Sequence, residues 1–440
     1  MKESIKKVLE DPYQNYIYSY PHKMSYREFK SPIELKSLWG ENDAEAITLY
    51  IHIPFCISKC GYCNLMSSTK IQRDRIHSYV KQLINEIKAV GKFLDIKDDD
   101  KNIFSSVIFG GGTPSILEVN EIKDVLDAAS MYLNIDYNDT FLSTEVSPRT
   151  LSEEKLNLFE SYGIDRISMG IQSFRENELK NVHRFEGLDN IKKSIDLLFK
   201  REIPIRNLDL IYGIEGQTME TWKESLQKVV YNSPEELYIY PLYIRENTCL
   251  YSKAEKNIDL MKEMYEFAKA FLKSNGYIQT SMRNFIREDM KMDLYPEYSC
   301  QENAMIGIGC GARSYIGNVH YSRKYAVLQN NINEIIDEYI AETDFSHAKH
   351  GYILDQDEMK RRYIQKSILK VTGLDLDDYN DVFGESPENY DELKDLEEYG
   401  FIEKRDNRYF PTEKGLLHSD SIGPLFISNV VKQKIEEFNE

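Results

Sequence analysis

The sequence lacks any long apolar run. No hydrophobic stretch approaches the roughly 18 residues that a membrane-spanning helix needs, and the N-terminal segment MKESIKKVLEDPYQNY has no apolar core of signal-peptide length. These two absences argue against a membrane partner and against export. We therefore expect a cytoplasmic protein.

The chain also lacks an excess of basic residues. Its 55 Lys and Arg stand against 73 Asp and Glu, which leaves a formal net charge of -18. A surface of this sign repels the phosphates of nucleic acid and of anionic lipids, so we expect a small-molecule substrate as partner and no nucleic acid. With 440 residues, 41% of them hydrophobic, the chain can bury one large core and a smaller second one.

Cysteine is scarce as well, with six in the whole chain, but three of the six are clustered. The segment HIPFCISKCGYCNLMSS, residues 52–68, holds these three. They are Cys56, Cys60 and Cys63. In a reducing compartment such a cluster indicates metal ligands or reactive thiols rather than a disulfide framework.

Three interpretations of the cysteine cluster are open at this point. A helix would place positions i, i+4 and i+7 on one face as a small buried stripe, although Pro54 and Gly61 disfavour a helix. A structural zinc ion could take His52 as a fourth ligand, although the usual paired CxxC signature is missing. An iron-sulfur cluster on three thiolates would keep one iron open for a ligand, and the spacing favours this interpretation. The remaining cysteines are not spaced for a second cluster: Cys249, Cys300 and Cys310.

Short β-rich runs alternate with longer amphipathic stretches along the middle of the chain. Near-continuous apolar strands that alternate with helices are typical of parallel βαβ units. Six such units predict an α/β fold with a partial (β/α)6 TIM-like barrel, and an open doubly wound sheet is the alternative. The runs are residues 47–53, 105–110, 140–146, 166–171, 207–213 and 236–242.

The pattern divides the chain into three parts. Residues 1–45 form a Tyr-rich N-terminal lead, and residues 46–345 form the barrel with its closing segment. Residues 346–440 read as a small, mainly helical C-terminal domain with a β-hairpin, similar to a winged helix. Its acidic balance argues against DNA binding.

Unusual polar residues fall at the ends of the predicted strands. The turn GGGTPS, residues 110–115, follows the second strand, and Glu145, Gln172 and Asp209 end the next three. In a barrel of this kind the chemistry sits at the carboxyl ends of the strands. Each feature alone has a structural explanation, but together they predict a site for a charged, nucleotide-like cofactor.

Several motifs can now be taken together. They are YIHIPFCISKCGYCN, FGGGTPS, STEVSP, RISMGIQSF, NLDLIYGIEGQT and GIGCGARSYIG. With these motifs the chain resembles the radical S-adenosylmethionine enzymes of the oxygen-independent coproporphyrinogen III dehydrogenase-like family. The resemblance covers nearly the whole chain.

The resemblance implies a radical S-adenosylmethionine (radical SAM) barrel, one four-iron, four-sulfur cluster on the three clustered cysteines, and an electron donor such as flavodoxin or ferredoxin. An electron from the reduced cluster would cleave S-adenosylmethionine to methionine and a 5′-deoxyadenosyl radical. The residues that the resemblance places around the cofactor are Tyr50, Tyr62, Gly111, Gly112, Thr113, Glu145, Gln172, Arg184, Asp209 and Ala312. The candidates on the substrate side are Tyr18, Tyr20, Tyr240 and Arg245.

Three activities compete within the resemblance. The first is oxidative decarboxylation of coproporphyrinogen III in porphyrin biosynthesis, but Leu65 stands where that enzyme has a further cysteine. The second is haem trafficking, against which the long lead YIYSYPHKMSYREF counts. The third, which we predict, is that of the class C methylases and alkylases. These bind two molecules of S-adenosylmethionine and methylate or cyclopropanate an sp² carbon of a small molecule. SYPHKMSYR, CGYCNL and YPLYIRENTCL look most like this group.

Overall fold

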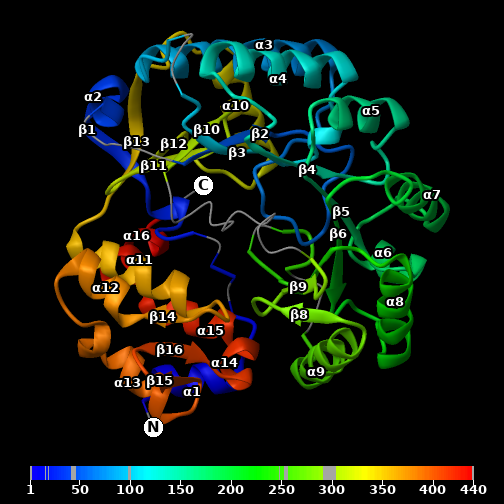
Figure 1. The fold of residues 1–440 in the computed structure, drawn as a ribbon, viewed down its shortest axis with the longest axis vertical. Helices are drawn as coiled ribbons and strands as arrows, with labels where there is room; N and C mark the ends of the chain where they lie inside the picture. The colour runs from blue at the N-terminus through cyan, green and yellow to red at the C-terminus, as the bar shows by residue number, and fades with distance from the viewer. Residues whose placement is uncertain are drawn as a thin grey trace.

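Most of the chain is built around a single large β-sheet. The computed structural model describes residues 2–14, 16–17, 19–40, 46–97, 101–246, 248–251, 256–290 and 304–438. The sheet has 13 strands in the order β1-β13-β12-β11-β10-β2-β3-β4-β5-β6-β7-β9-β8 (Figure 1). Their bounds are β1 Arg27–Glu34, β2 Ile47–Ile53, β3 Phe104–Gly111, β4 Phe141–Val146, β5 Arg166–Gln172, β6 Ile205–Tyr212, β7 Glu236–Pro241, β8 Tyr277–Gln279, β9 Asn284–Arg287, β10 Met305–Ile308, β11 Arg313–Ile316, β12 Val319–Ser322 and β13 His347–Ile353.

The centre of the sheet is parallel. Strands β2 to β7 pair in sequence order, each parallel to the next, and β10 extends the parallel run beyond β2. The strand sequences are nearly all apolar because helices cover them. In β2, ITLYIHI, every residue except Tyr50 is buried. The predicted α/β fold with a (β/α)6 partial barrel is therefore confirmed, with β10 as an additional parallel strand.

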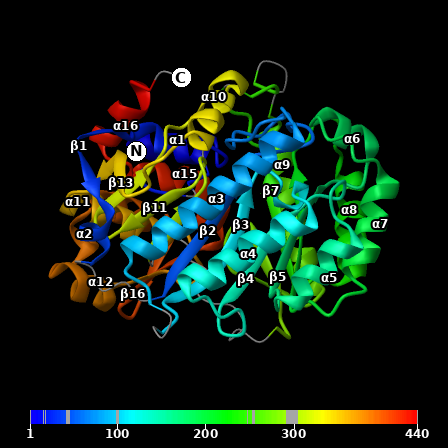
Figure 2. The same ribbon diagram turned by 90° about the horizontal axis from the view of Figure 1, so that it is seen from above.

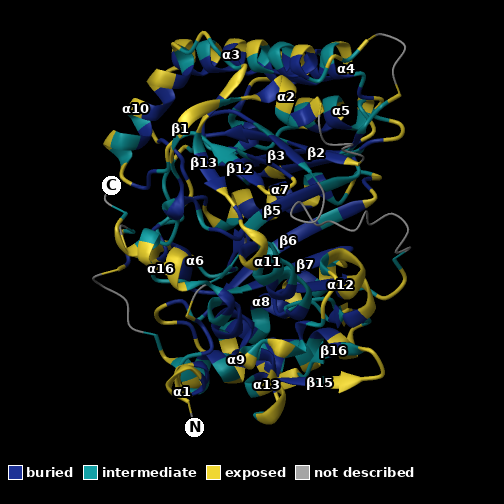
Figure 3. Cartoon of the chain, turned by 90° about the vertical axis from the view of Figure 1, so that its left-hand side faces the viewer, coloured by how far each residue is buried: buried dark blue, intermediate teal, exposed yellow. Residues whose placement is uncertain are grey.

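Helices line the outside of the parallel strands (Figure 2). Each turns an apolar stripe inward, as in α3, where Ile76, Tyr79, Leu83 and Ile87 are buried at helical spacing. Figure 3 shows the result as buried strands beneath helices whose outer faces are exposed. These helices are α2 Leu35–Gly40, α3 Arg73–Phe93, α4 Val119–Leu133, α5 Glu153–Ser161, α6 Glu176–Asn181, α7 Leu188–Leu198, α8 Met219–Asn232, α9 Ile258–Ser274 and α10 Gln329–Ile340.

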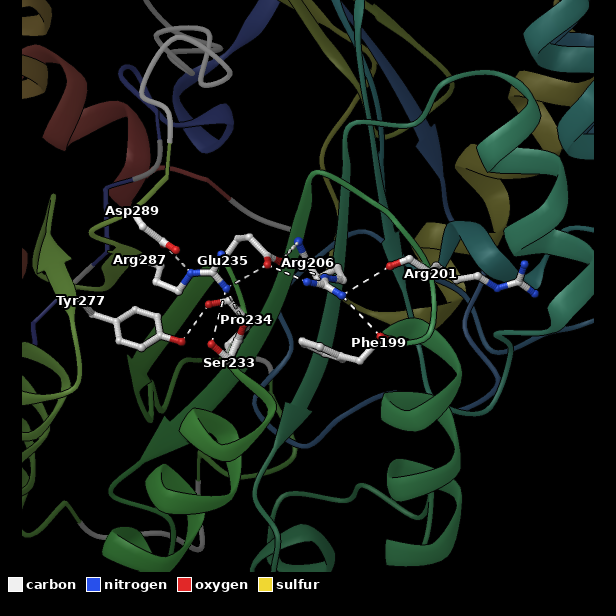
Figure 4. A network of polar contacts seen from close by, with 9 residues as sticks. All are labelled: Phe199, Arg201, Arg206, Ser233, Pro234, Glu235, Tyr277, Arg287 and Asp289. Carbon is white, nitrogen blue, oxygen red and sulfur yellow. Dashed lines mark hydrogen bonds and ion pairs between the residues drawn. The ribbon is translucent and has the colours of Figure 1, made fainter.

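An ion-pair network holds the strands together where β6 and β7 begin (Figure 4). Glu235, directly before β7, accepts from Arg206 Nη2 at 2.6 Å and from Arg287 Nη1 at 3.1 Å. Arg206 also donates to the carbonyl oxygens of Phe199 and Arg201, at 3.4 and 3.3 Å. Two guanidinium groups on one nearly buried carboxylate join β6, β7 and β9 at the end of the barrel opposite the carboxyl ends of the strands.

A smaller unit follows the large sheet. Strand β13 still belongs to the sheet, so this unit begins after Leu354. It combines helices with a three-stranded sheet in the order β14-β16-β15. Its elements are α11 Gln356–Ile368, β14 Leu374–Asp375, α12 Leu376–Phe383, α13 Asp391–Glu398, β15 Ile402–Arg405, β16 Arg408–Pro411, α14 Glu413–Leu417, α15 Ser419–Ile422 and α16 Asn429–Glu436.

The N-terminal lead is divided between the two units. Helix α1, Glu3–Glu10, buries Ile5 and Val8 in the apolar core of the smaller unit, where Figure 1 shows it beside β15. Strand β1 instead pairs antiparallel with β13 at the edge of the large sheet. The lead therefore packs as part of both cores. In the described part of the chain, no helix combines the length and the apolar character needed to cross a membrane.

Candidate functional site

The three clustered cysteines lie in an irregular loop that leaves the end of β2. The loop is anchored by main-chain hydrogen bonds from Cys56 N to Ser68 O at 3.0 Å and from Gly61 N to Val182 O at 2.9 Å. Gly61 is required because a Cβ there would lie 2.9 Å from Leu250 Cγ. The segment is not helical, so the interpretation of the cysteines as a buried helical stripe is wrong.

All three thiols line one cavity of about 180 Å³, which we call the cysteine cavity. The Thr113 hydroxyl donates to Cys56 Sγ at 3.4 Å, and Arg184 Nη1 donates to Cys60 Sγ at 3.7 Å. Burial, together with the neighbouring Cys60 and Cys56, raises the pKa of Cys63 to about 12. Three thiolates could not share this place without compensating positive charge, which the irons of a cluster would supply. The residues present therefore fit an iron-sulfur cluster.

The zinc alternative is not supported by the geometry. His52 Nε2 lies 3.0 Å from the carbonyl oxygen of Met66, and the ring lines a different cavity. Within the described ranges, no three His, Cys, Asp or Glu side chains lie close enough together to hold a single metal ion. A cluster of four irons spaces its ligands further apart than one ion does, so this finding does not bear on it.

The glycine-rich turn after β3 lies against the start of the cysteine loop. Gly112 N donates to Ile53 O at 2.8 Å, and Thr113 N donates to Phe55 O at 2.9 Å. A Cβ on Gly112 would lie 2.7 Å from Phe55 O, and Gly111 has φ of 109°, which favours glycine. The turn thus brings main chain to the wall of the cysteine cavity, which Gly111, Gly112 and Thr113 all line.

Two carboxylates face the same cavity from the parallel strands. Glu145 near the end of β4 and Asp209 in β6 both line it. Glu145 is accessible to solvent because its side chain borders this cavity inside the barrel. Burial, then the nearby Asp209, raises the pKa of Glu145 to about 7. Burial raises the pKa of Asp209 to about 6, although Asn207 Nδ2 donates to it at 2.7 Å. Both acids are poised to ionise near neutral pH.

Further predicted residues complete this wall. Gln172 ends β5 with φ of 65°, a backbone conformation that side chains rarely adopt and that occurs at functional sites. Arg184 donates through Nη2 to Gly170 O at 2.6 Å and is 2.7 Å from a Glu186 carboxylate oxygen. Tyr62, between the last two cysteines, lines the cavity with them. Segments that lie far apart in the sequence therefore meet at one cavity.

A second cavity, of about 210 Å³, adjoins the first and is called here the inner chamber. Leu65, Gly111 and Glu145 line both. Tyr50, predicted near the cofactor, lines the inner chamber rather than the cysteine cavity. Ala312, predicted there too, lines neither: it borders a separate cavity on the other side of its loop, and its carbonyl oxygen accepts from Lys23 Nζ at 3.1 Å.

The substrate-side candidates are spread around these cavities. Tyr20 is buried, lines the inner chamber and donates its hydroxyl to the Glu358 carboxylate. Tyr20 also lines a third cavity of about 410 Å³, the outer vestibule, together with Arg245. Tyr240 stacks on Tyr238 with ring centroids 5.5 Å apart. Tyr18 lies outside the described residues.

Three basic residues of the inner chamber were not predicted from the sequence. Lys23, Arg313 and Arg362 line it, from the N-terminal lead, β11 and α11. The first two lie within the motifs SYPHKMSYR and GIGCGARSYIG, whereas Arg362 lies on a helix without any motif. A larger cavity, of about 910 Å³, lies near the other ends of the strands and contains none of the candidate residues.

Comparison with known proteins agrees with this site. Residues 50–229 match the model of the radical SAM superfamily. The heme chaperone HemW of Bacillus subtilis is 26% identical over 395 residues, which cover 87% of this chain and 99% of that protein. HemW of Escherichia coli is 29% identical over 279 residues, 61% of this chain and 70% of that protein.

Among solved structures, coproporphyrinogen III oxidase (HemN) from Escherichia coli matches with a TM-score of 0.77 over 93% of this chain and 96% of that chain. Its 22% sequence identity establishes a shared fold and no more. None of these three proteins is named as a methylase, so alkylation with two cofactor molecules stays a prediction. The matched residues 50–229 contain the cysteine loop, Glu145 and Asp209, so this part of the chain is similar to the radical SAM superfamily.

Proposed function

We propose that this protein is a radical SAM enzyme whose substrate is a tetrapyrrole. The observation that carries the proposal is that the three thiols, the glycine-rich turn, Glu145 of β4 and Asp209 of β6 all line one cavity. Such a cavity suits an iron-sulfur cluster with a charged nucleoside beside it. When bound, the reduced cluster supplies the electron that cleaves S-adenosylmethionine.

The chain's own residues would bind and orient the cofactor. Cys56, Cys60 and Cys63 would hold the cluster. Glu145 and Asp209, once ionised, can accept hydrogen bonds from hydroxyl or ammonium groups, and the turn at Gly111 leaves main chain open to the cofactor. Because burial of these acids costs free energy without a partner, a bound cofactor that donates to them would relieve that cost.

The substrate would occupy the inner chamber. Leu65, Gly111 and Glu145 form a wall common to this chamber and the cysteine cavity, so a substrate there would lie directly beside the cofactor. The chamber lies deep in the molecule, where Tyr20 and His52 are only 2% and 4% exposed. Exclusion of water protects a reactive intermediate from side reactions.

The proposed tetrapyrrole substrate is based on the relatives, since the names of both HemW and HemN refer to such molecules.

Two other functions are each supported by a specific observation. A heme chaperone is favoured by the match to 99% of the Bacillus subtilis HemW. Methylation or cyclopropanation with a second S-adenosylmethionine is favoured by the SYPHKMSYR lead. Decarboxylation is disfavoured by Leu65.

One experiment separates these possibilities. The anaerobically reconstituted protein is incubated with dithionite, S-adenosylmethionine carrying a deuterated methyl group, and either coproporphyrinogen III or haem. The proposal predicts 5′-deoxyadenosine whose yield rises when one tetrapyrrole is present. Deuterium in the 5′-deoxyadenosine would favour alkylation with a second cofactor molecule, whereas haem binding without any 5′-deoxyadenosine would refute the enzyme and favour the chaperone.

A further inference from the structure

The inner chamber is a basic site in an acidic protein. Of the described residues that line it, Lys23, Arg313 and Arg362 are basic and Glu145 alone is acidic, while the chain as a whole carries a net charge of -18. Each basic residue comes from a different part of the chain, namely the lead, the closing segment and the smaller unit. The fold therefore brings together basic residues that lie far apart in the sequence.

The positive charge in the chamber acts on its other titratable groups. Burial, together with the positive charge of Arg362 and Arg313, holds the pKa of His320 well below its usual value. Burial and Arg313 do the same to the pKa of Lys23. Like charges gathered in a buried place cost free energy, and an anion among them offsets that cost. A negatively charged ligand would therefore be stabilised in the chamber.

Two of the three basic residues, Lys23 and Arg362, make contacts that fix their positions. Lys23 Nζ donates to the carbonyl oxygens of Gly311 and Ala312, so its donors hold the loop that precedes Arg313. The Arg362 guanidinium lies over the ring of Tyr315, 5.1 Å from the ring centroid. Tyr315 and Arg362 both line the chamber, and a guanidinium is the side chain best suited to bind a carboxylate through two parallel hydrogen bonds.

We propose that Arg313 and Arg362 bind carboxylate groups of the substrate in the inner chamber, and that Lys23 positions Arg313 by holding its loop. This rests on the proposed function, since it names the groups by which that substrate is recognised. The common wall at Leu65, Gly111 and Glu145 then faces the part of the substrate that reacts. The smaller unit contributes to recognition through Arg362, so the substrate joins it to the barrel.

The first test measures binding of two porphyrin probes to the reconstituted full-length protein by fluorescence. Coproporphyrin III carries four carboxylates, and its tetraamide carries none. We expect the wild type to prefer the acid, and Arg313→Gln or Arg362→Gln to weaken its binding at least about tenfold, the loss of one charge-assisted pair. Arg361→Gln is the matched control, because Arg361 on the same helix pairs with Asp357 at 2.7 Å and does not line the chamber.

A second test does not depend on a tetrapyrrole. Glutarate, a small dicarboxylate, should raise the melting temperature of the wild type and of Arg361→Gln but not of the double variant Arg313→Gln/Arg362→Gln. If glutarate stabilises the wild type and Arg361→Gln but not the double variant, and no porphyrin binds, the proposed substrate is wrong and the carboxylate site stands. If the double variant responds to glutarate as the wild type does, or the acid and the amide bind alike, the carboxylate site is refuted.

Discussion

Replacing Asp209 by Asn should make the cofactor-free protein more stable while weakening cofactor binding. Burial raises the pKa of Asp209 from 3.8 to about 6, so the penalty for ionising it grows as the pH rises through this window and is complete above it. A shift of about two units corresponds to ~3 kcal/mol of lost stability at pH 8. Asn keeps an oxygen that can accept from Asn207 but carries no charge. Removing the charge of Asp209 should also lower the pKa of Glu145, because Asp209 helps to raise it.

The assay is thermal unfolding of the two proteins without S-adenosylmethionine. For a chain of this length ~3 kcal/mol corresponds to a rise in melting temperature of about 3 °C at pH 8, and about half of that at pH 5. Asp196→Asn, on the exposed face of α7, is the control and should change nothing. A shift of Asp209→Asn that is zero, negative or the same at both pH values would refute the reasoning. S-adenosylmethionine affinity should fall in Asp209→Asn and not in the control.

Three other perturbations test separate parts of the structure. Cys60→Ala should abolish cluster assembly, read as loss of bound iron and of brown colour, and full iron content would contradict the assigned ligands. Glu235→Gln removes the charge that Arg206 and Arg287 share, so we expect destabilisation by about 3 kcal/mol in urea unfolding with the cluster still assembled. Asp420→Ala leaves the buried Arg283 without its carboxylate partner between the two units, and limited proteolysis should then release the smaller unit faster. Unchanged proteolysis would mean that other contacts hold the units together.

The parallel core could be predicted from the sequence because its signals are local. Buried β-strands are apolar along their whole length, and residues at their carboxyl ends meet at one rim. Glu145 could therefore be assigned to this site from its position at the end of an apolar run. The prediction that Asp209 ends its strand is wrong, because β6 continues to Tyr212 and Asp209 lines the cavity from within the strand. The cysteine loop could be recognised because Pro54 and Gly61 disfavour a helix.

The inner chamber could not be predicted in the same way. Arg361 and Arg362 are neighbours on α11. Arg361 forms an ion pair with Asp357, whereas Arg362 lines the chamber. Only the packing of the smaller unit against the barrel decides which of the two faces the cavity. Ala312 is the opposite case. Its motif predicted a position near the cofactor, but its side of the loop borders a separate cavity and neither the cysteine cavity nor the inner chamber.

The position of α1 has a consequence for how the chain folds during synthesis. Ile5 and Val8 are 1% exposed in a core whose other members, such as Leu393 and Phe426, follow the whole barrel in the sequence. Helix α1 must therefore remain without these apolar partners while the barrel between them is being synthesised. Deleting Glu3–Glu10 would remove Ile5 and Val8 from this core and leave a cavity in the smaller unit.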